Sequence, residues 1–167
     1  MATGVYDIRC SVVVLRNHEV LLLRRTGGGR DDWVLPGGTP REEETAAECA
    51  RRELLEETSL SADLSRVALV VESEIPGSAR RQLDLVFLAT EPVLGRELPR
   101  EPGLEPQFVS SGRLPHLVLH PPVSGHLIRL LDPGASQHVP YVGNARGQSR
   151  APAPRLQGYV DKQEARS

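Results

Sequence analysis

The sequence has little cysteine and no long hydrophobic runs, and each shortage excludes a class of protein. Its two cysteines, Cys10 and Cys49, fit neither a disulfide framework nor a paired-cysteine metal site. No charged-then-apolar segment of the kind that directs secretion precedes residue 10, so we expect a cytoplasmic protein of a reducing compartment. The longest apolar runs, such as residues 11–15 and 20–23, are far too short to span a bilayer.

An excess of charge of either sign is also missing. The chain has 20 basic and 22 acidic residues, which give a formal net charge of −2. Nucleic acids and anionic membranes attract basic surfaces, so we expect neither as the main partner. Hydrophobic residues make up 39% of the 167 residues, which is enough for one soluble globular domain with its own core.

Apolar and polar residues alternate in a way that predicts several strands. Residues 5–15 and 20–24 are rich in β-formers and flank a polar break at 17–19, which is a hairpin pattern. Further strands are predicted at 67–71, 82–90 and 107–110. The run Gly27–Gly29 predicts a flexible loop. It lacks the Gly-Lys-Ser/Thr ending of a phosphate-binding loop, which argues against that type of NTPase.

Two helices are predicted. The clearer one covers 45–58, where Thr45 is an N-cap, Glu48 completes a capping box, and one apolar stripe consists of Ala46, Ala47, Ala50 and Leu54. We expect Pro121-Pro122 to open the second helix, because proline is tolerated in the first turn. Apolar periodicity stops at Asp132. We therefore predict a domain over 1–131 and a Pro/Gly/Arg-rich tail over 132–167, either mobile or strapped over a neighbouring subunit.

Three glutamates on the first predicted helix are the candidates for chemistry. Glu53, Glu56 and Glu57 stand at i, i+3 and i+4, so their carboxylates share one helix face beside the apolar stripe. Their mutual repulsion costs roughly 0.2–0.5 kcal/mol per adjacent pair, and more where hydration is lost. A divalent cation would offset it, and carboxylate oxygens favour Mg²⁺, Mn²⁺ or Ca²⁺ over zinc. Taken alone, the three acids fit a solvated acidic helix face better than a metal site.

The surroundings of these acids resemble the Nudix box, Gly-x5-Glu-x7-Arg-Glu-apolar-x-Glu-Glu-x-Gly-apolar. The chain has Gly38, Glu44 and then Arg-Glu-Leu-Leu-Glu-Glu-Thr-Ser-Leu over residues 52–60, and residues 33–38 are similar to the lead-in of the family. Ser59 stands where the family has glycine. Serine adopts the left-handed conformation usual at that point at a cost of roughly 1 kcal/mol, which puts the local turn in doubt but removes no acid.

The resemblance implies a Nudix-type α/β/α sandwich with a mixed β-sheet, in which the box forms a loop–helix–loop catalytic motif. It implies that Glu53, Glu56 and Glu57 ligate Mg²⁺ or Mn²⁺, and that one of them takes a proton from the attacking water. A carbonyl of Gly37 or Gly38 commonly joins such a metal site. Arg52 and Glu44 match positions that form a supporting ion pair. A metal held in this way neutralises phosphoryl oxygens and lowers the pKa of bound water.

Outside the box, each candidate substrate contact has a plain structural alternative. Either Glu101 or Glu105 supplies a further acid before residues 107–109, which resemble a recurrent acid-x-x-aromatic strand of the family, or both are solvated loop residues. Arg80 and Arg81 either meet phosphate or solvate an edge strand.

Other residues carry similar pairs of interpretations. Pro76 resembles a marker of ADP-ribose-cleaving members, or it is an ordinary loop proline. Trp33 is interpreted as a core residue in preference to a base-stacking platform. The histidines that either contact the ligand or serve as ordinary loop and helix residues are His116, His120 and His126.

We therefore expect an enzyme that uses metal and water to split a phosphoanhydride. The substrate is expected to be a nucleoside diphosphate linked to another moiety (ADP-ribose-like, nucleotide sugar or dinucleotide) or a nucleoside triphosphate. The alternative is a non-catalytic Nudix-fold sensor that binds a nucleotide. Such proteins typically lose box acids or carry a separate DNA-binding region, whereas this chain keeps the acids. A homodimer is common in the family, but the sequence identifies no interface.

Overall fold

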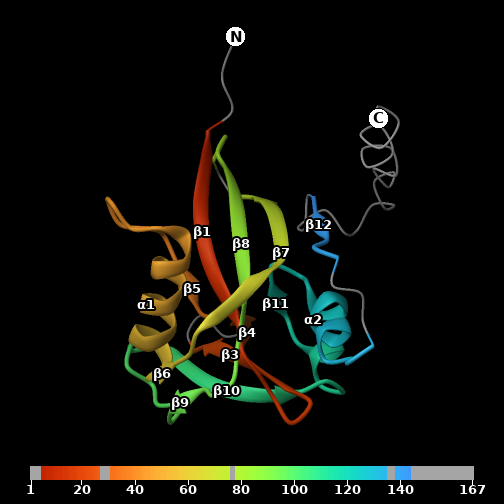
Figure 1. Cartoon of the computed structure of the whole chain (residues 1–167). Helices are drawn as coiled ribbons and strands as arrows, with labels where there is room; N and C mark the ends of the chain where they lie inside the picture. Colours follow the sequence, from red (N-terminus) through yellow and green to blue (C-terminus); the bar gives the residue numbers. More distant parts are fainter. Residues whose placement is uncertain (1–4, 27–30, 76–77, 135–137, 144–167) are drawn as a thin grey trace, which may run out of the picture.

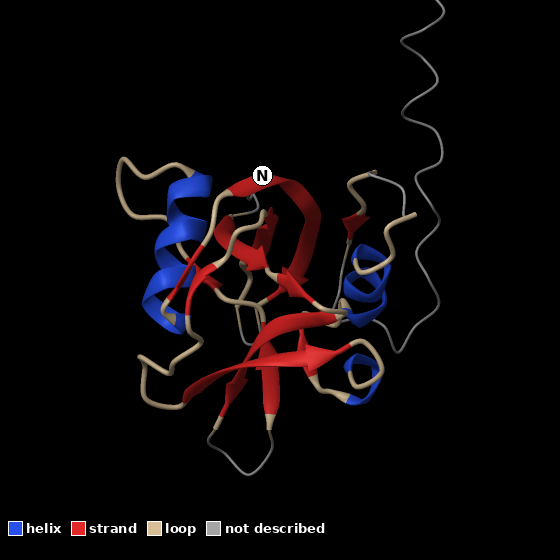
Figure 2. Ribbon diagram, turned by 60° about the horizontal axis from the view of Figure 1, so that its bottom comes forward, coloured by secondary structure: helices blue, strands red, loops and turns tan. Residues whose placement is uncertain are grey.

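The computed structural model describes residues 5–26, 31–75, 78–134 and 138–143, in which two α-helices flank mixed β-sheets. The helices are α1 (Ala46–Thr58) and α2 (Ser124–Leu130), with a short 3₁₀ helix η1 (Leu114–His116) before α2. Figure 1 shows α1 on one side of the strands and α2 on the other, and Figure 2 shows the same separation after rotation. The predicted α/β/α arrangement with mixed sheets is confirmed.

The first sheet has the strand order β12–β7–β8–β1–β5. In that order its strands are Tyr141–Val142, Leu64–Glu74, Arg81–Ala89, Tyr6–Val13 and Gly37–Gly38. Strand β1 runs parallel to β8, whereas β7 and β8 are antiparallel, so the sheet is mixed. The predicted strands at 67–71 and 82–90 are both present, and β7 extends well beyond its predicted ends.

The second sheet has the order β10–β3–β4–β11 and packs across the first. Its strands are Leu104–Ser110, Glu19–Arg25, Asp32–Val34 and Leu119–His120, with the short β2 (Leu15–Arg16) paired to β3. A separate two-stranded ladder joins β6 (Leu60–Ser61) to β9 (Leu94–Gly95). The predicted strand at 107–110 therefore begins three residues earlier, at Leu104.

The predicted N-terminal hairpin is present, but its first strand is divided between the sheets. The turn residues Asn17 and His18 both have positive φ, 48° and 64°, as a two-residue hairpin turn between right-twisted strands requires. The chain leaves the first sheet after Val13, and only Leu15–Arg16 pairs with β3. Both segments are β-rich, so composition alone does not show the break.

Helix α1 begins and ends where its sequence signals predict. Thr45 is the N-cap and forms the complete capping box with Glu48. At the other end Ser59 adopts the left-handed conformation (φ 63°, ψ 12°), and its N–H donates to the carbonyl of Leu55 at 3.0 Å. Serine thus makes the turn that the family makes with glycine.

The prediction that Pro121-Pro122 opens the second helix is wrong. Helix α2 begins at Ser124, and its N-cap Val123 has a non-helical backbone (φ −110°, ψ 16°). Both prolines therefore precede the cap and belong to the segment that follows β11. The apolar periodicity was nevertheless informative, because Val123 and Leu127 are fully buried.

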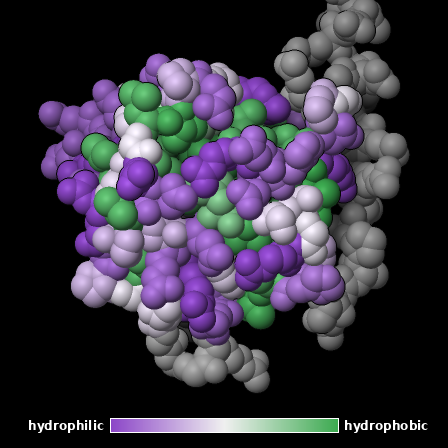
Figure 3. Space-filling model, turned by 90° about the horizontal axis from the view of Figure 1, so that it is seen from below, coloured by the Kyte–Doolittle hydropathy of each residue, from purple (hydrophilic) through white to green (hydrophobic). Residues whose placement is uncertain are grey.

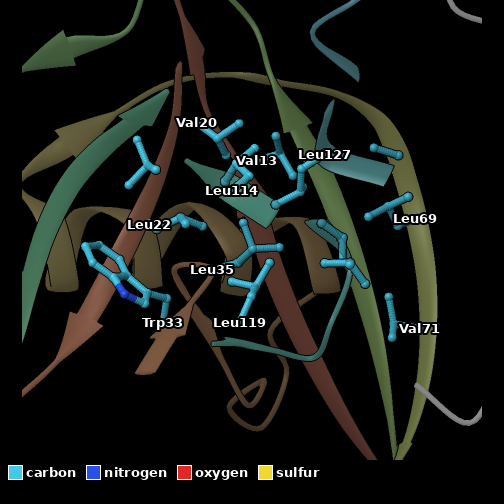
Figure 4. Close-up of a cluster of buried hydrophobic side chains, with 14 of the residues drawn as sticks. Val13, Val20, Leu22, Trp33, Leu35, Leu69, Val71, Leu114, Leu119 and Leu127 are labelled. Atoms are coloured by element: carbon cyan, nitrogen blue, oxygen red, sulfur yellow. The ribbon is translucent and has the colours of Figure 1, made fainter. Parts of the chain in front are cut away.

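The hydrophobic core has two parts on opposite faces of β1. Val13 points to the part between the sheets and α2, which also contains Trp33 and Leu127 (Figure 4). Val12 points to the part beneath α1, which it shares with Leu54. Trp33 is 4% exposed, which confirms its interpretation as a core residue. The second part anchors α1 and so fixes the direction in which its glutamates project.

The remaining predictions concern the cysteines, membrane-spanning helices, the surface and the segments outside the predicted elements. Both cysteines are free and buried. In the described part of the chain no helix is long and apolar enough to cross a membrane, and the face in Figure 3 is largely hydrophilic with small hydrophobic areas. The structure places Tyr141–Val142 as strand β12 beside β7, a strand that the sequence did not predict. Residues 27–30, Pro76 and residues 144–167 lie outside the described residues.

Candidate functional site

The site is built where the short strand β5 runs between β1 and helix α1. Gly38 pairs with Cys10 and Gly37 pairs with Ser11. Neither glycine leaves room for a side chain, because a Cβ on Gly37 would lie 2.4 Å from the Cys10 carbonyl oxygen, and one on Gly38 would lie 2.2 Å from an oxygen of Glu53. The two glycines thus allow the backbone to approach the carboxylates of α1 closely.

Glu57 is the most buried of the three box acids. The residue is only 7% exposed, and the Gly37 N–H donates to its Oε2 at 2.8 Å. Burial raises the pKa of Glu57 to about 7, because the ionised form loses hydration; the Gly37 hydrogen bond and the charge of Arg9 oppose the shift. No ion pair involving Glu57 occurs among the described residues, so its negative charge has no direct cationic partner.

Arg52 organises the neighbouring acids. Its Nε and Nη2 donate to the two oxygens of Glu44 at 2.8 and 2.9 Å, and its Nη1 donates to Glu53 at 2.7 Å. The forked hydrogen bond holds the pKa of Glu44 at about 2. The ion pair between Arg52 and Glu44 that the resemblance implied is present, and it ties the loop before α1 to the helix.

Glu56 lies at the outer edge of this cluster. Its carboxylate accepts from Arg52 Nη1 at 3.0 Å and from Arg41 at 3.1 Å, and 42% of its side chain is exposed. Glu53 and Glu57 contact the Gly37–Gly38 segment, whereas Glu56 faces the arginines. Among the described residues no three His, Cys, Asp or Glu side chains already converge as metal ligands.

The donor set nevertheless fits a hard divalent cation. It consists of the carboxylate oxygens of Glu53 and Glu57 beside the backbone of Gly37 and Gly38, and such oxygens are the ligands that Mg²⁺ and Mn²⁺ prefer. The buried charge of Glu57 lacks a direct cationic partner, which is the condition that a bound cation relieves. Glu56 would have to turn away from Arg41 to join them.

A cleft of about 850 Å³ opens beside Glu57, between the two sheets. The first sheet contributes Arg9, Ser73 and Gln82 to its lining. The opposite wall is mostly apolar and comes from the second sheet and the segments around β11; its residues are Arg25, Val34, Leu104, Leu117, Val118, Leu119, His120, Pro121 and Pro122. The volume lies within the range of small-molecule sites.

Arg9 connects the cleft to a buried polar network in the first sheet. Its Nη2 donates to the Leu35 carbonyl at 3.1 Å and its Nε to the Ser11 hydroxyl at 3.2 Å. Ser11 in turn donates to the carboxylate of Asp84, whose residue is 2% exposed and whose pKa is raised by burial. Arg9 Nε lies 3.7 Å from Asp84. This network holds the guanidinium at the cleft wall.

The structure separates the two candidate acids of the later loop. Glu105 lies 3.5 Å from Arg24, which lines a smaller cleft on the other face of the second sheet. Glu101 is exposed, and its charge is one of the influences that raise the pKa of Glu57. Glu101 is therefore the acid on the side of the candidate site.

The two candidate phosphate-binding arginines have partners elsewhere. Arg80 forms an ion pair with Asp7, and Arg81 forms one with Glu72 at 2.5 Å. Neither lines the cleft beside Glu57. Their role in substrate binding stays a prediction.

The three candidate histidines lie in three different places. His120 lines the cleft beside Glu57, with its Nε2 3.8 Å from Asp32. His116 lines the smaller cleft, and His126 lies on α2, where burial lowers its pKa. Of the three, only His120 is placed to meet a ligand bound next to Glu57.

Sequence reasoning missed the polar residues that the first sheet contributes. Arg9 and Ser11 alternate along β1, and Arg9 is paired with Asp84 on β8, so the three residues share one face of the first sheet. An acidic residue in the middle of the run Gln82–Ala89 was the available signal, because buried charges occur mainly where they are paired or functional.

Comparison with known proteins gives one family and several similar structures. Residues 5–130 match the model of the NUDIX domain family. The oxidized purine nucleoside triphosphate hydrolase of Mus musculus is 32% identical over 111 residues, which cover 66% of this chain and 70% of that protein.

Two solved structures illustrate the shared fold. A mutator MutT protein from Bacillus halodurans aligns with a TM-score of 0.67 at 22% identity, covering 81% of this chain and 86% of that one. An ADP-ribose pyrophosphatase from Streptococcus suis aligns with a TM-score of 0.59 at 19% identity, covering 83% and 98%. At these identities the likeness extends to the fold alone, and a shared fold does not determine the substrate.

Proposed function

The chain belongs to the Nudix family of hydrolases, and from this premise we propose that it splits a phosphoanhydride bond of a nucleotide with Mg²⁺ or Mn²⁺ held at the box glutamates. The observation that carries the proposal is the position of Glu57. It is buried, fixed by the Gly37 N–H at 2.8 Å, without a direct cationic partner among the described residues, and on the wall of a cleft large enough for a nucleotide.

Each box residue has a role that follows from its contacts. Glu53 and Glu57 would ligate the metal from one side of the Gly37–Gly38 backbone, with a carbonyl of that segment and Glu56 as further ligands. Arg52 holds Glu53 in place and is itself fixed by Glu44. The bound metal would supply charge neutralisation at the phosphoryl oxygens and a more acidic water.

The other groups at the cleft complement a phosphorylated substrate. Arg9 places a permanent positive charge beside Glu57, and Arg25 adds one at the opposite wall. Burial raises the pKa of Glu57 to about 7 in the metal-free protein, and a bound cation would lower it. Arg9 would bind and orient phosphate, and one of the three box glutamates would accept the proton of the attacking water.

For the substrate we favour a nucleoside triphosphate, because the mouse relative carries that substrate class in its name. Nucleoside diphosphates linked to a sugar, a ribose or a second nucleoside are the second candidate class. A hydrolysis screen over both classes with Mg²⁺ or Mn²⁺, with products identified by mass, decides between them. Binding without hydrolysis of any of them would support a nucleotide sensor.

Glu57→Gln tests the site itself. The amide keeps the size of the side chain but neither binds a cation strongly nor accepts a proton, so turnover should fall by roughly 10²–10⁴-fold under Mg²⁺. Glu74→Gln is the matched control, because it makes the same change of charge at an exposed position outside the cleft. Unchanged turnover in Glu57→Gln would place the active site elsewhere.

A further inference from the structure

We propose that Ser73 and Gln82 determine which base the enzyme accepts, by reading the hydrogen-bonding edge of an adenine-type nucleobase. The inference rests on the proposed function of the cleft and assigns its substrate more narrowly. Both residues line the cleft from the first sheet, and they are paired across β7 and β8. Directly paired residues of neighbouring strands share a face, so the hydroxyl and the carboxamide project side by side.

Both groups are available for a ligand. Ser73 is only 4% exposed, and in the described part of the chain neither the Ser73 hydroxyl nor the Gln82 carboxamide has a hydrogen-bond partner. Among the described residues, the buried side-chain atom without a hydrogen-bond partner is Arg81 Nε, so the Ser73 hydroxyl is open to the cleft and not enclosed. A group left without a protein partner at a cleft wall is therefore a candidate to bond a ligand.

The charged side chains of the cleft each have at least one protein partner. Arg25 holds both oxygens of Asp32, and Arg9 donates to Leu35 and Ser11. Asp7, which is paired with Gln82 on β1, forms an ion pair with Arg80. Arg9 is the residue that we assign to phosphate, so the groups left for the base on this wall, among the described residues, are one amide and one hydroxyl.

Strand register places this pair away from the hydrolytic end. Arg9 is paired with Asp84, and Gln82 lies two residues before Asp84 on β8. Two residues along a strand correspond to roughly 7 Å. Phosphates bound near Arg9 and Glu57 would thus leave the ribose and base to extend along the sheet towards Ser73 and Gln82.

The opposite wall completes a site for a flat base. It presents Val34, Leu119, Pro121 and Pro122, whose apolar surfaces suit the faces of a ring system. The carboxamide offers an adjacent donor and acceptor, which match the amino group and ring nitrogen of adenine in a bidentate pair. Guanine is typically read by an arginine or a carboxylate, and the two groups that we assign to the base are neither.

The experiment compares kcat/KM for ATP, GTP, CTP and UTP, or for the corresponding diphosphate-linked substrates, in the wild type and in Gln82→Met. The wild type should prefer the adenine nucleotide. Gln82→Met has nearly the same size but no polar group, so the preference for adenine over guanine should fall by about five- to hundredfold. Gln107→Met, in the smaller cleft on the other face of the second sheet, is the matched control and should keep the preference.

Gln82→Glu makes the test independent of folding. A carboxylate accepts but does not donate, so the preference should move towards guanine, whose edge offers two neighbouring donors; a misfolded variant does not gain a new preference. An equal preference in wild type, Gln82→Met and Gln82→Glu would overturn the inference while leaving the proposed function intact. Absence of hydrolysis of every nucleotide by the wild type would instead refute both.

Discussion

Among single residues, Glu57 combines burial, a fixed orientation and a pKa of about 7, and this combination has a measurable consequence for stability. The ordinary value is 4.5, so the folded protein binds this proton more tightly than the unfolded chain does. Folding is therefore favoured by this group below pH 4.5, and the advantage is lost as pH rises through 7. Glu44, whose pKa is about 2, stabilises the folded protein above pH 4.5, and this contribution is lost as the pH falls from 4.5 to 2.

We predict that the metal-free wild type loses stability between pH 5 and pH 8 relative to Glu57→Gln. The difference should be on the order of 2 kcal/mol, because the variant cannot ionise at this position. Urea unfolding of both proteins at several pH values in the presence of a chelator measures it. Added Mg²⁺ should remove this loss in the wild type and should leave the pH profile of the variant unchanged. Parallel pH profiles for the two proteins would show that Glu57 titrates normally.

For single residues, the arrangement of the helix acids could be predicted from the sequence, but their burial could not. The spacing of Glu53 and Glu57 was sufficient to place both on one helix face, and the pairing of Arg52 with Glu44 followed from their positions in the box. Spacing could not show that Glu57 is buried while Glu56 is held by Arg41, because that depends on the loop before α1. Nor could it show Arg9, which comes into the site only when β1 is placed beside β5.

For secondary-structure elements, the sequence predicted the start of a helix correctly where it contains the capping residues. Helix α1 has its capping box in the sequence, and the structure has the same box. The start of α2 was predicted wrongly because proline also fits the extended chain before a helix, and its neighbours give no capping signal. The division of the first β-rich segment between two sheets depends on tertiary packing at Val14, which is fully buried.

The C-cap of α1 provides a prediction for this scale. Ser59 has a φ of 63°, a conformation that glycine adopts without the cost that a Cβ imposes. Ser59→Gly should therefore stabilise the protein by roughly 0.5–1 kcal/mol in thermal or urea unfolding. Ser61→Gly in strand β6 is the control, and it should destabilise by a similar amount, because its backbone is extended. A loss of stability in Ser59→Gly would mean that the serine side chain contributes to the turn.

For the whole molecule, the question is where the folded unit ends. The predicted boundary at residue 131 stays a prediction, but strand β12 gives a physical argument for a later one. Its residue Val142 is 8% exposed and belongs to the core between the sheets and α2. Pro140 accepts a backbone hydrogen bond from Val70, and the Tyr141 hydroxyl bonds to Glu72. Two residues are too short a segment for periodicity to reveal, so this strand depends on tertiary contacts.

We predict that a chain ending at Leu131 is less stable than a chain ending at Gly143 by about 2–4 kcal/mol. The loss combines the burial of Val142, roughly 1.5–3 kcal/mol, with the hydrogen bonds of β12 to β7. Urea unfolding of the two chains measures it, and Val142→Ala in the chain ending at Gly143 isolates the burial component. Because β7 also carries Ser73, the shorter chain should in addition show a weakened base preference, while turnover at Glu57, which lies on α1 and not on β7, changes less. Equal stability of the chains ending at 131 and 143 would contradict this argument and favour a domain that ends with α2.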